Sequence, residues 1–118
     1  MNGVDVEGPI LDTAYQSFVG LFPIPVRHGM TLGELANMIV GEKWFGEKFR
    51  VDLTVIPMEG WNRKMWYSET GLDWVSPSPN MKTESTATVY PGTCIFEATN
   101  VSEGRGTEKP FEYIGAPW

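Results

Sequence analysis

An acid and an arginine stand two positions apart in the segment Ser102-Glu103-Gly104-Arg105-Gly106-Thr107. The glycines on both sides of Arg105 let the backbone adopt positive φ or approach a ligand closely. The guanidinium could bind a carboxylate through two parallel hydrogen bonds, and Glu103 could be one of the two acids that cleave a glycosidic bond. A tight surface turn with a solvated ion pair explains the same residues, so both interpretations stay open.

The single histidine, His28, stands between Arg27 and Gly29 just before a helix start. An imidazole in such a loop can form a hydrogen bond with a sugar hydroxyl or a carboxylate, and Arg27 can serve as the anion partner. The alternative is that His28 packs locally while Arg27 pairs with a surface acid. The sequence alone favours this alternative, because a position in a loop is only a weak sign of function.

Two further polar residues are candidates for ligand contacts. Glu7, in Glu7-Gly8-Pro9, is an acid at a predicted strand end, and such positions face the ligand crevice in open α/β sheets. An acid exposed to solvent is the alternative. Asn80 follows Pro79 and could turn its amide toward a ligand, but an Asx-type turn is the better interpretation of that pair.

Composition excludes several classes of site. The net charge is −6 and no basic cluster exists, so binding to nucleic acid or to an anionic lipid surface is not expected, whereas a neutral or sugar-like ligand is allowed. One histidine and one cysteine, Cys94, far apart in the chain, predict no metal site and no intrachain disulfide. No phosphate-binding loop and no apolar run of membrane-spanning length is present, so no cofactor and no membrane span are expected.

The elements that position these residues start with a helix predicted over residues 32–42. Thr31 is a favourable N-cap, and Glu34 three residues later completes a capping box. Apolar residues recur at helical spacing and predict one buried stripe, formed by Leu32, Leu35, Ala36, Ile39 and Val40. Before this helix, prolines at 23 and 25 favour an extended course for residues 21–26, which delivers Arg27-His28-Gly29 to a fixed place.

The remaining elements alternate between strand and helix. Residues 51–56 are rich in β-branched side chains and predict a strand, and an irregular aromatic stretch follows over 59–80. A second helix is predicted from Thr83, and Pro91 is expected to break or restart it as a new helix over 91–99 that carries Cys94, Ile95 and Phe96 inward. Residues 100–107 are interpreted as a strand end and a glycine-rich loop. Alternation of this kind favours an α/β fold.

The chain of 118 residues has room for one domain, and we expect residues 1–118 to be a single partial domain. The first nine residues have acids and no basic start, which is not the pattern of a signal peptide. Both ends are apolar, whereas domains commonly end in polar, poorly ordered residues. The sequence therefore predicts a segment of a longer protein.

Many separated segments resemble, in the same order, the NamZ-type exo-β-N-acetylmuramidases. They include Val6-Glu7-Gly8-Pro9, Val89-Tyr90-Pro91-Gly92-Thr93-Cys94, and residues 18–21, 23–31, 55–58, 60–61, 77–81, 100–107, 110–112 and 115–118. The resemblance spans nearly the whole chain. It implies an α/β fold, part of a Rossmann-like domain leading toward a smaller C-terminal domain, with the active cleft between the two.

The resemblance also implies an activity, the removal of terminal N-acetylmuramic acid from the non-reducing end of peptidoglycan fragments, in a parent protein that is secreted, periplasmic or a lipoprotein. The family's proposed catalytic glutamate lies in an acidic-His-Gly motif that this sequence lacks, so the isolated chain is expected to be inactive. The candidate site then comprises one acid for catalysis and five substrate-binding residues: Glu103, and Glu7, Arg27, His28, Asn80 and Arg105. A non-catalytic sugar-binding module and a truncated inactive fragment are the alternatives.

Overall fold

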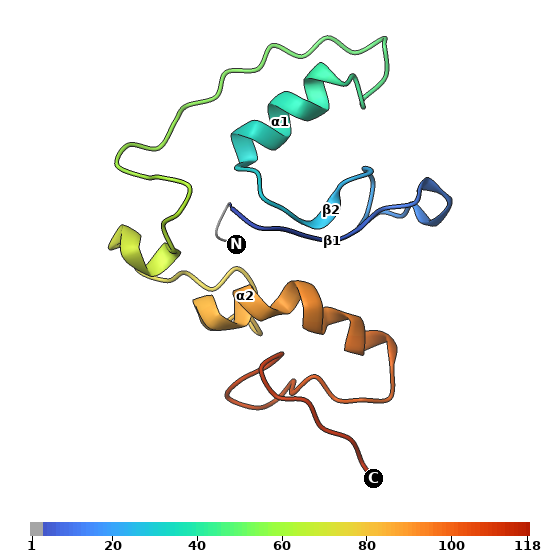
Figure 1. Ribbon diagram of the computed structural model, residues 1–118, viewed down its shortest axis with the longest axis vertical. Coiled ribbons are helices and arrows are strands. Elements are labelled where there is room, and N and C mark those ends of the chain that lie inside the picture. Colours follow the sequence, from blue (N-terminus) through green and yellow to red (C-terminus); the bar gives the residue numbers. More distant parts are fainter. Residues whose placement is uncertain (1–3) are drawn as a thin grey trace. The chain divides into compact units, whose positions relative to one another are not determined.

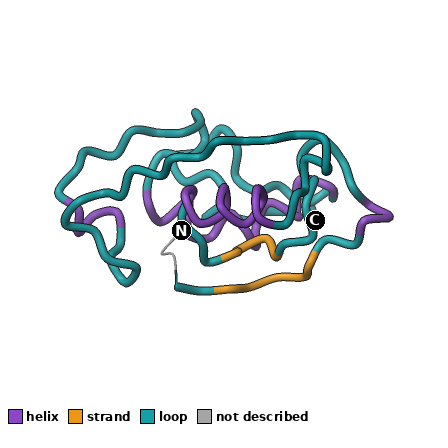
Figure 2. The backbone as a smooth tube through the Cα atoms, turned by 90° about the horizontal axis from the view of Figure 1, so that it is seen from above, coloured by secondary structure: helices purple, strands orange, loops and turns teal. Residues whose placement is uncertain are grey.

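A computed structural model describes residues 4–118 of the chain. The described residues form two compact units, 4–64 and 65–118, and each is described by itself. The first unit contains strands β1 (Val6–Ile10) and β2 (Pro25–His28), the short 3₁₀ helix η1 (Thr13–Tyr15) and helix α1 (Leu32–Gly41). The second contains η2 (Tyr67–Thr70), helix α2 (Glu84–Thr93) and η3 (Cys94–Ala98). Long loops separate α1 from η2 and η2 from α2, whereas η3 follows α2 directly (Figures 1 and 2).

The strands β1 and β2 form a two-stranded antiparallel sheet. Glu7 pairs with Arg27, and the register is irregular between Glu7 and Ile10, where Gly8 has a φ of 88°. A bulge at this point is compatible with glycine because a side chain is strained at that φ. The pairing of β1 with β2 corrects the expected positions of Glu7, Arg27 and His28. Glu7 lies within a strand and not at its end, and Arg27 and His28 belong to a strand and not to a loop, because β1 offers their backbone a pairing partner.

Helix α1 confirms the predicted helix and its capping box. The Thr31 hydroxyl accepts from the Glu34 N–H at 3.1 Å, and Glu34 Oε2 accepts from the Thr31 N–H at 2.9 Å. The predicted stripe is correct only in part, because Leu32 is 85% exposed whereas the other four members are half-buried. Arg63 links the start of α1 to Gly29, which precedes the helix. Its guanidinium donates to the Gly29 carbonyl at 2.8 Å and forms an ion pair with Glu34.

We expect Thr31→Ala to destabilise this unit by about 1 kcal/mol, because the substitution leaves the Glu34 N–H without its capping acceptor. The measurement is the midpoint of urea unfolding compared with the unsubstituted protein. Thr54→Ala is the matched control, at an exposed threonine outside any helix. Equal midpoints for Thr31→Ala and the control would contradict a stabilising role for the cap.

The strand predicted over residues 51–56 is wrong. These residues follow an extended course, but no neighbouring strand pairs with them in the part of the chain that the structure describes. Tertiary packing decides this outcome, because Val55 lies against the first turn of α1. A Cβ atom added to Gly33 would lie 2.5 Å from Val55 Cγ1. Val55 therefore covers the helix start, and glycine at 33 makes that close approach possible.

Helix α2 starts after the Thr83 N-cap, as predicted, with the Thr83 hydroxyl accepting from the Thr86 N–H at 3.1 Å. The expectation that Pro91 breaks the helix is wrong, because α2 continues through Pro91 to Thr93. Proline removes one backbone donor, and near the last turn this loss is small enough for the helix to continue. The predicted helix over 91–99 is found only as η3, and its Ile95 is 66% exposed instead of pointing inward.

The best-buried residues of the second unit are Thr86, Gly104, Pro110 and Phe111. Three hydroxyls near the start of α2 donate to the Glu112 carboxylate. Thr86 donates at 2.6 Å, Ser85 at 3.2 Å and Thr83 at 3.3 Å. A carboxylate is also favoured at a helix N-terminus by the helix dipole. Glu112 therefore fixes the C-terminal segment to α2.

The hydroxyl of Thr86, followed by those of Ser85 and Thr83, holds the pKa of the Glu112 carboxyl below its ordinary value of 4.5. A carboxyl whose pKa is lower in the folded state contributes stability above the unfolded pKa, and that contribution is lost as the pH falls through the folded pKa. We expect Glu112→Gln to cost about 1 kcal/mol at neutral pH and to reduce the loss of stability on acidification. Urea unfolding at about pH 7 and about pH 3 measures both effects.

Glu59→Gln, at an exposed acid, serves as the control for Glu112→Gln. It should leave the pH dependence of stability unchanged. An acid-induced loss of the same size in Glu112→Gln and in the unsubstituted protein would contradict the role of Glu112.

Candidate functional site

The side chain of Arg105 is held by two carboxylates. Its Nε lies 2.7 Å from Glu103 Oε1, and its Nη2 forms an ion pair with Glu97 Oε1. The two acids differ in exposure, since the Glu103 side chain is 12% exposed and that of Glu97 is 35% exposed. The hydrogen bond from Arg105 to Glu97, with Glu103 adding to it, raises the pKa of Arg105 above its usual value. The guanidinium is therefore a permanent cation at this position.

The ring of Phe111 lies against this guanidinium. The Arg105 Cζ lies 5.0 Å from the centroid of the Phe111 ring, which is a cation–π contact. Phe111 is only 2% exposed, and Tyr90 packs edge-on against it with the ring centroids 4.8 Å apart. The backbone of Phe111 has a φ of 63°, which is a rare conformation for a bulky residue. A conformation of this cost persists only where the surroundings impose it.

The loop that carries Arg105 is fixed at several points. Ser102 and Gly115 form an antiparallel bridge with hydrogen bonds of 2.7 and 2.9 Å, and the Phe111 N–H donates to the Glu103 carbonyl at 2.6 Å. Gly104 has a φ of 79°, and a Cβ there would lie 2.9 Å from the Tyr113 carbonyl oxygen. Glycine is therefore required at 104. The glycine-rich loop predicted within 100–107 is confirmed, whereas the predicted strand end is found only as the isolated Ser102–Gly115 bridge. The structure brings Glu103 and Arg105 together in this loop.

A second set of predicted residues lies together on the β1–β2 hairpin. Arg27 Nε lies 2.9 Å from Glu7 Oε2 across the paired strands, and the Arg27 side chain is 12% exposed. The next residue, His28, accepts at Nδ1 from the Met30 N–H at 3.1 Å. A neutral His28 with this bond carries its proton on Nε2, so it offers a donor to a ligand.

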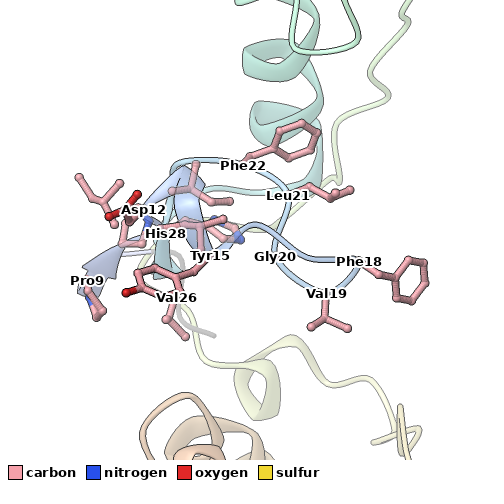
Figure 3. Close-up of a pocket in the computed structure, with 14 residues that line it drawn as sticks. Pro9, Asp12, Tyr15, Phe18, Val19, Gly20, Leu21, Phe22, Val26 and His28 are labelled. Carbon is pink, nitrogen blue, oxygen red and sulfur yellow. The ribbon is translucent and has the colours of Figure 1, made fainter.

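An apolar pocket of about 710 Å³ lies beside His28 in the same unit (Figure 3). The β1–β2 hairpin and the connection over residues 11–24 form its walls, and the polar groups at its edge come from Asp12, Tyr15 and His28. A concave apolar surface with few polar groups is typical of small-molecule sites. At one end of the pocket, the turn closed by mutual hydrogen bonds between Ser17 and Gly20 exposes Phe18 almost completely.

Asn80 lies half-buried in a turn over residues 78–81, in which the Met81 N–H donates to the Ser78 carbonyl at 2.9 Å. The aromatic stretch around it packs internally. Tyr67 and Trp74 meet edge to face at 5.1 Å, and the Trp74 indole donates to the Met81 carbonyl at 3.1 Å. The Tyr67 and Trp74 rings therefore pack within their own unit, and a ligand role for Asn80 stays a prediction.

The structure of residues 4–118 bears on metal binding and on membrane crossing. No group of three histidine, cysteine or acidic side chains in that range is arranged to hold a metal ion. No helix in that range has both the length and the apolar character needed to cross a bilayer.

Comparison with known proteins decides the family. The family model described as the N-terminal part of the exo-beta-N-acetylmuramidase NamZ matches residues 1–85. The chain belongs to the NamZ family. The model for the C-terminal part of NamZ matches residues 88–118, so the boundary between the two NamZ models falls within α2.

Two relatives extend the comparison. The protein named peptidoglycan beta-N-acetylmuramidase NamZ from Bacillus subtilis (strain 168) is 54% identical over 118 residues, which is 98% of this chain and 27% of that protein. The crystal structure of a DUF1343 family protein from Bacteroides fragilis NCTC 9343 matches 98% of this chain and 32% of that chain, with a TM-score of 0.88 and 46% identity. This NamZ chain therefore has the mixed α and β structure of its relatives and spans less than a third of their length.

The sequence does not indicate two residues of this candidate site. Glu97 was only part of a predicted helix, although a lone acid after Cys94-Ile95-Phe96 was a weak signal of a charged partner. Phe111 had no local signal at all, because neither its positive φ nor its contact with Arg105 follows from spacing. Both residues act on Arg105 from other parts of the chain, so only the folded structure reveals them.

Proposed function

We propose that this NamZ chain is part of an exo-acting glycoside hydrolase that removes terminal N-acetylmuramic acid from the non-reducing end of peptidoglycan fragments. In this proposal, residues 1–118 form a single partial domain, a portion of a Rossmann-like domain leading toward the smaller C-terminal domain. Residues 1–3 of that range lie outside the described residues. The observation that carries the proposal is the 54% identity, across nearly the whole chain, to a protein named as a peptidoglycan muramidase.

The chemistry of the substrate supports a role for Arg105. N-acetylmuramic acid carries a lactyl carboxylate, and a guanidinium is the side chain best suited to hold a carboxylate through two hydrogen bonds. Arg105 is 47% exposed and fixed on the Phe111 ring, so it is oriented before a ligand arrives. We assign the lactyl carboxylate to Arg105.

The hairpin residues are assigned to sugar contacts. Arg27 is largely buried and paired with Glu7, which favours a role in holding the hairpin next to the pocket. His28 lines that pocket and offers its Nε2–H to a hydroxyl or carbonyl of the sugar. Asn80 remains a candidate for a further hydrogen bond to the substrate.

A catalytic role for Glu103 is part of the proposal, and orientation of Arg105 is the alternative role for this carboxylate. A general acid or nucleophile must reach the glycosidic bond, and the Glu103 carboxylate is held by Arg105 at 2.7 Å. Orientation of Arg105 is the simpler role for a carboxylate in that contact. The acid that protonates the leaving group is therefore assigned to sequence beyond these residues, and the 118-residue chain alone is expected to be inactive.

The test compares two proteins on a chromogenic β-N-acetylmuraminide. A full-length NamZ protein that carries these 118 residues should release the chromophore, and the 118-residue chain alone should not. Release by the short chain would contradict the assignment of the acid. A full-length protein that binds N-acetylmuramic acid without hydrolysing the chromogenic substrate would favour the alternative function, a non-catalytic sugar-binding module.

A further inference from the structure

Two acids of the chain already bind part of the Arg105 guanidinium. A carboxylate can bind an arginine at two planar edges, one formed by Nε and Nη2 and the other by Nη1 and Nη2. Glu103 lies on Nε and Glu97 lies on Nη2. The edge that remains for a carboxylate ligand is Nη1–Nη2, and Glu97 occupies one of its two nitrogens.

The two acids are not equivalent partners. Glu103 is nearly covered, and its own carbonyl accepts from Phe111, so it belongs to the fixed frame of the loop. Glu97 comes from η3 and is about three times as exposed as Glu103 at its side chain. An ion pair with an exposed partner is weak and exchanges readily. Glu97 is therefore the partner that an incoming carboxylate can displace.

The net charge of the cluster formed by Arg105, Glu103 and Glu97 also favours displacement of Glu97. One guanidinium with two carboxylates carries a net charge of −1, which repels an anionic ligand. Without Glu97, the Arg105–Glu103 pair is neutral and presents two free N–H groups at the open edge.

We propose that Glu97 is a built-in competitor for the carboxylate site at Arg105 and thereby sets the affinity and the carboxylate specificity of the NamZ substrate site. This inference rests on the proposed function, in which Arg105 holds the lactyl carboxylate. The Glu97 side chain contacts the Arg105 edge and is exchanged for the substrate carboxylate when the substrate binds. The apparent affinity for the substrate is the intrinsic affinity multiplied by the fraction of molecules in which Glu97 leaves this edge free.

The test uses a full-length NamZ protein that carries these residues, with free N-acetylmuramic acid and N-acetylglucosamine as probes. The two sugars differ in the lactyl carboxylate. Glu97→Gln should tighten the binding of N-acetylmuramic acid about three- to tenfold in calorimetry and leave that of N-acetylglucosamine unchanged. Glu97→Ala should do the same, which separates loss of the competing charge from any new contact of the amide.

Glu108→Gln is the matched control, because it removes one acid from an exposed position three residues after Arg105. It should leave both affinities unchanged. Weaker binding of N-acetylmuramic acid to Glu97→Gln and Glu97→Ala, or an equal change for both sugars, would overturn the competitor role, since a purely structural Glu97 cannot improve binding. If the unsubstituted protein fails to bind or hydrolyse muramic substrates, the proposed function itself fails, and the inference fails with it.

Discussion

Replacing Arg105 with alanine in a full-length NamZ protein is expected to lower kcat/KM for a β-N-acetylmuraminide by about 10- to 100-fold, because the lactyl carboxylate loses a charged hydrogen-bond partner. The protein should remain folded, since the Arg105 side chain is about half exposed and the ion pairs of an exposed side chain add little to stability. The measurements are steady-state kinetics and thermal unfolding of the same preparation.

Arg105→Lys is the informative companion to Arg105→Ala. Lysine keeps the charge but loses the planar fork, so its activity should fall between that of alanine and that of the unsubstituted protein. Full activity in Arg105→Ala would remove Arg105 from the substrate site. A collapse in thermal stability without a change in activity per folded molecule would identify Arg105 as structural only.

Replacing Phe111 with alanine is expected to produce the largest loss of stability, about 3–5 kcal/mol, because the ring is a fully buried aromatic group in the second unit. The substitution opens a cavity beside Tyr90 and removes the ring beneath Arg105. Chemical denaturation of the full-length protein measures the free energy of unfolding. Phe49→Ala, at a ring that is 71% exposed, should change it by less than about 0.5 kcal/mol.

A glycine substitution tests the backbone of Phe111 separately. Glycine is ordinarily less stabilising than alanine, but at a φ of 63° alanine is strained and glycine is not. Phe111→Gly should therefore be no less stable than Phe111→Ala, although both lack the ring. A Phe111→Gly protein that is clearly less stable than Phe111→Ala would contradict a positive φ at this residue in solution.

Local sequence patterns were sufficient where neighbouring residues decide the structure. The α1 start follows from Thr31 and Glu34, whose side chains satisfy backbone groups only three positions away. The α2 start follows from Thr83 for the same reason. The glycine loop around Arg105 also follows, because glycine is the residue that tolerates positive φ at low cost. Elements of this kind need no knowledge of the rest of the chain.

Local sequence patterns did not predict the structure where contacts with a segment distant in sequence determine it. Residues 51–56 have strand-forming side chains, but Val55 packs on α1 at Gly33 and no strand pairs with it among the described residues. The β1–β2 pairing placed Arg27 opposite Glu7, a partner twenty residues away in sequence. Leu32 fits the helical stripe and is nevertheless exposed, since helical spacing cannot show how far a packing partner extends.

The sequence by itself determined the NamZ family resemblance, the two helix starts and the presence of an acid and an arginine in one glycine-rich loop. Only the tertiary structure decided which groups hold that arginine. Glu97 reaches it from η3, and Phe111 lies beneath it in a backbone conformation that no pattern indicates. The physical reason is that ion pairs and ring contacts depend on distance in space, whereas sequence spacing specifies only contacts within a turn or a single element.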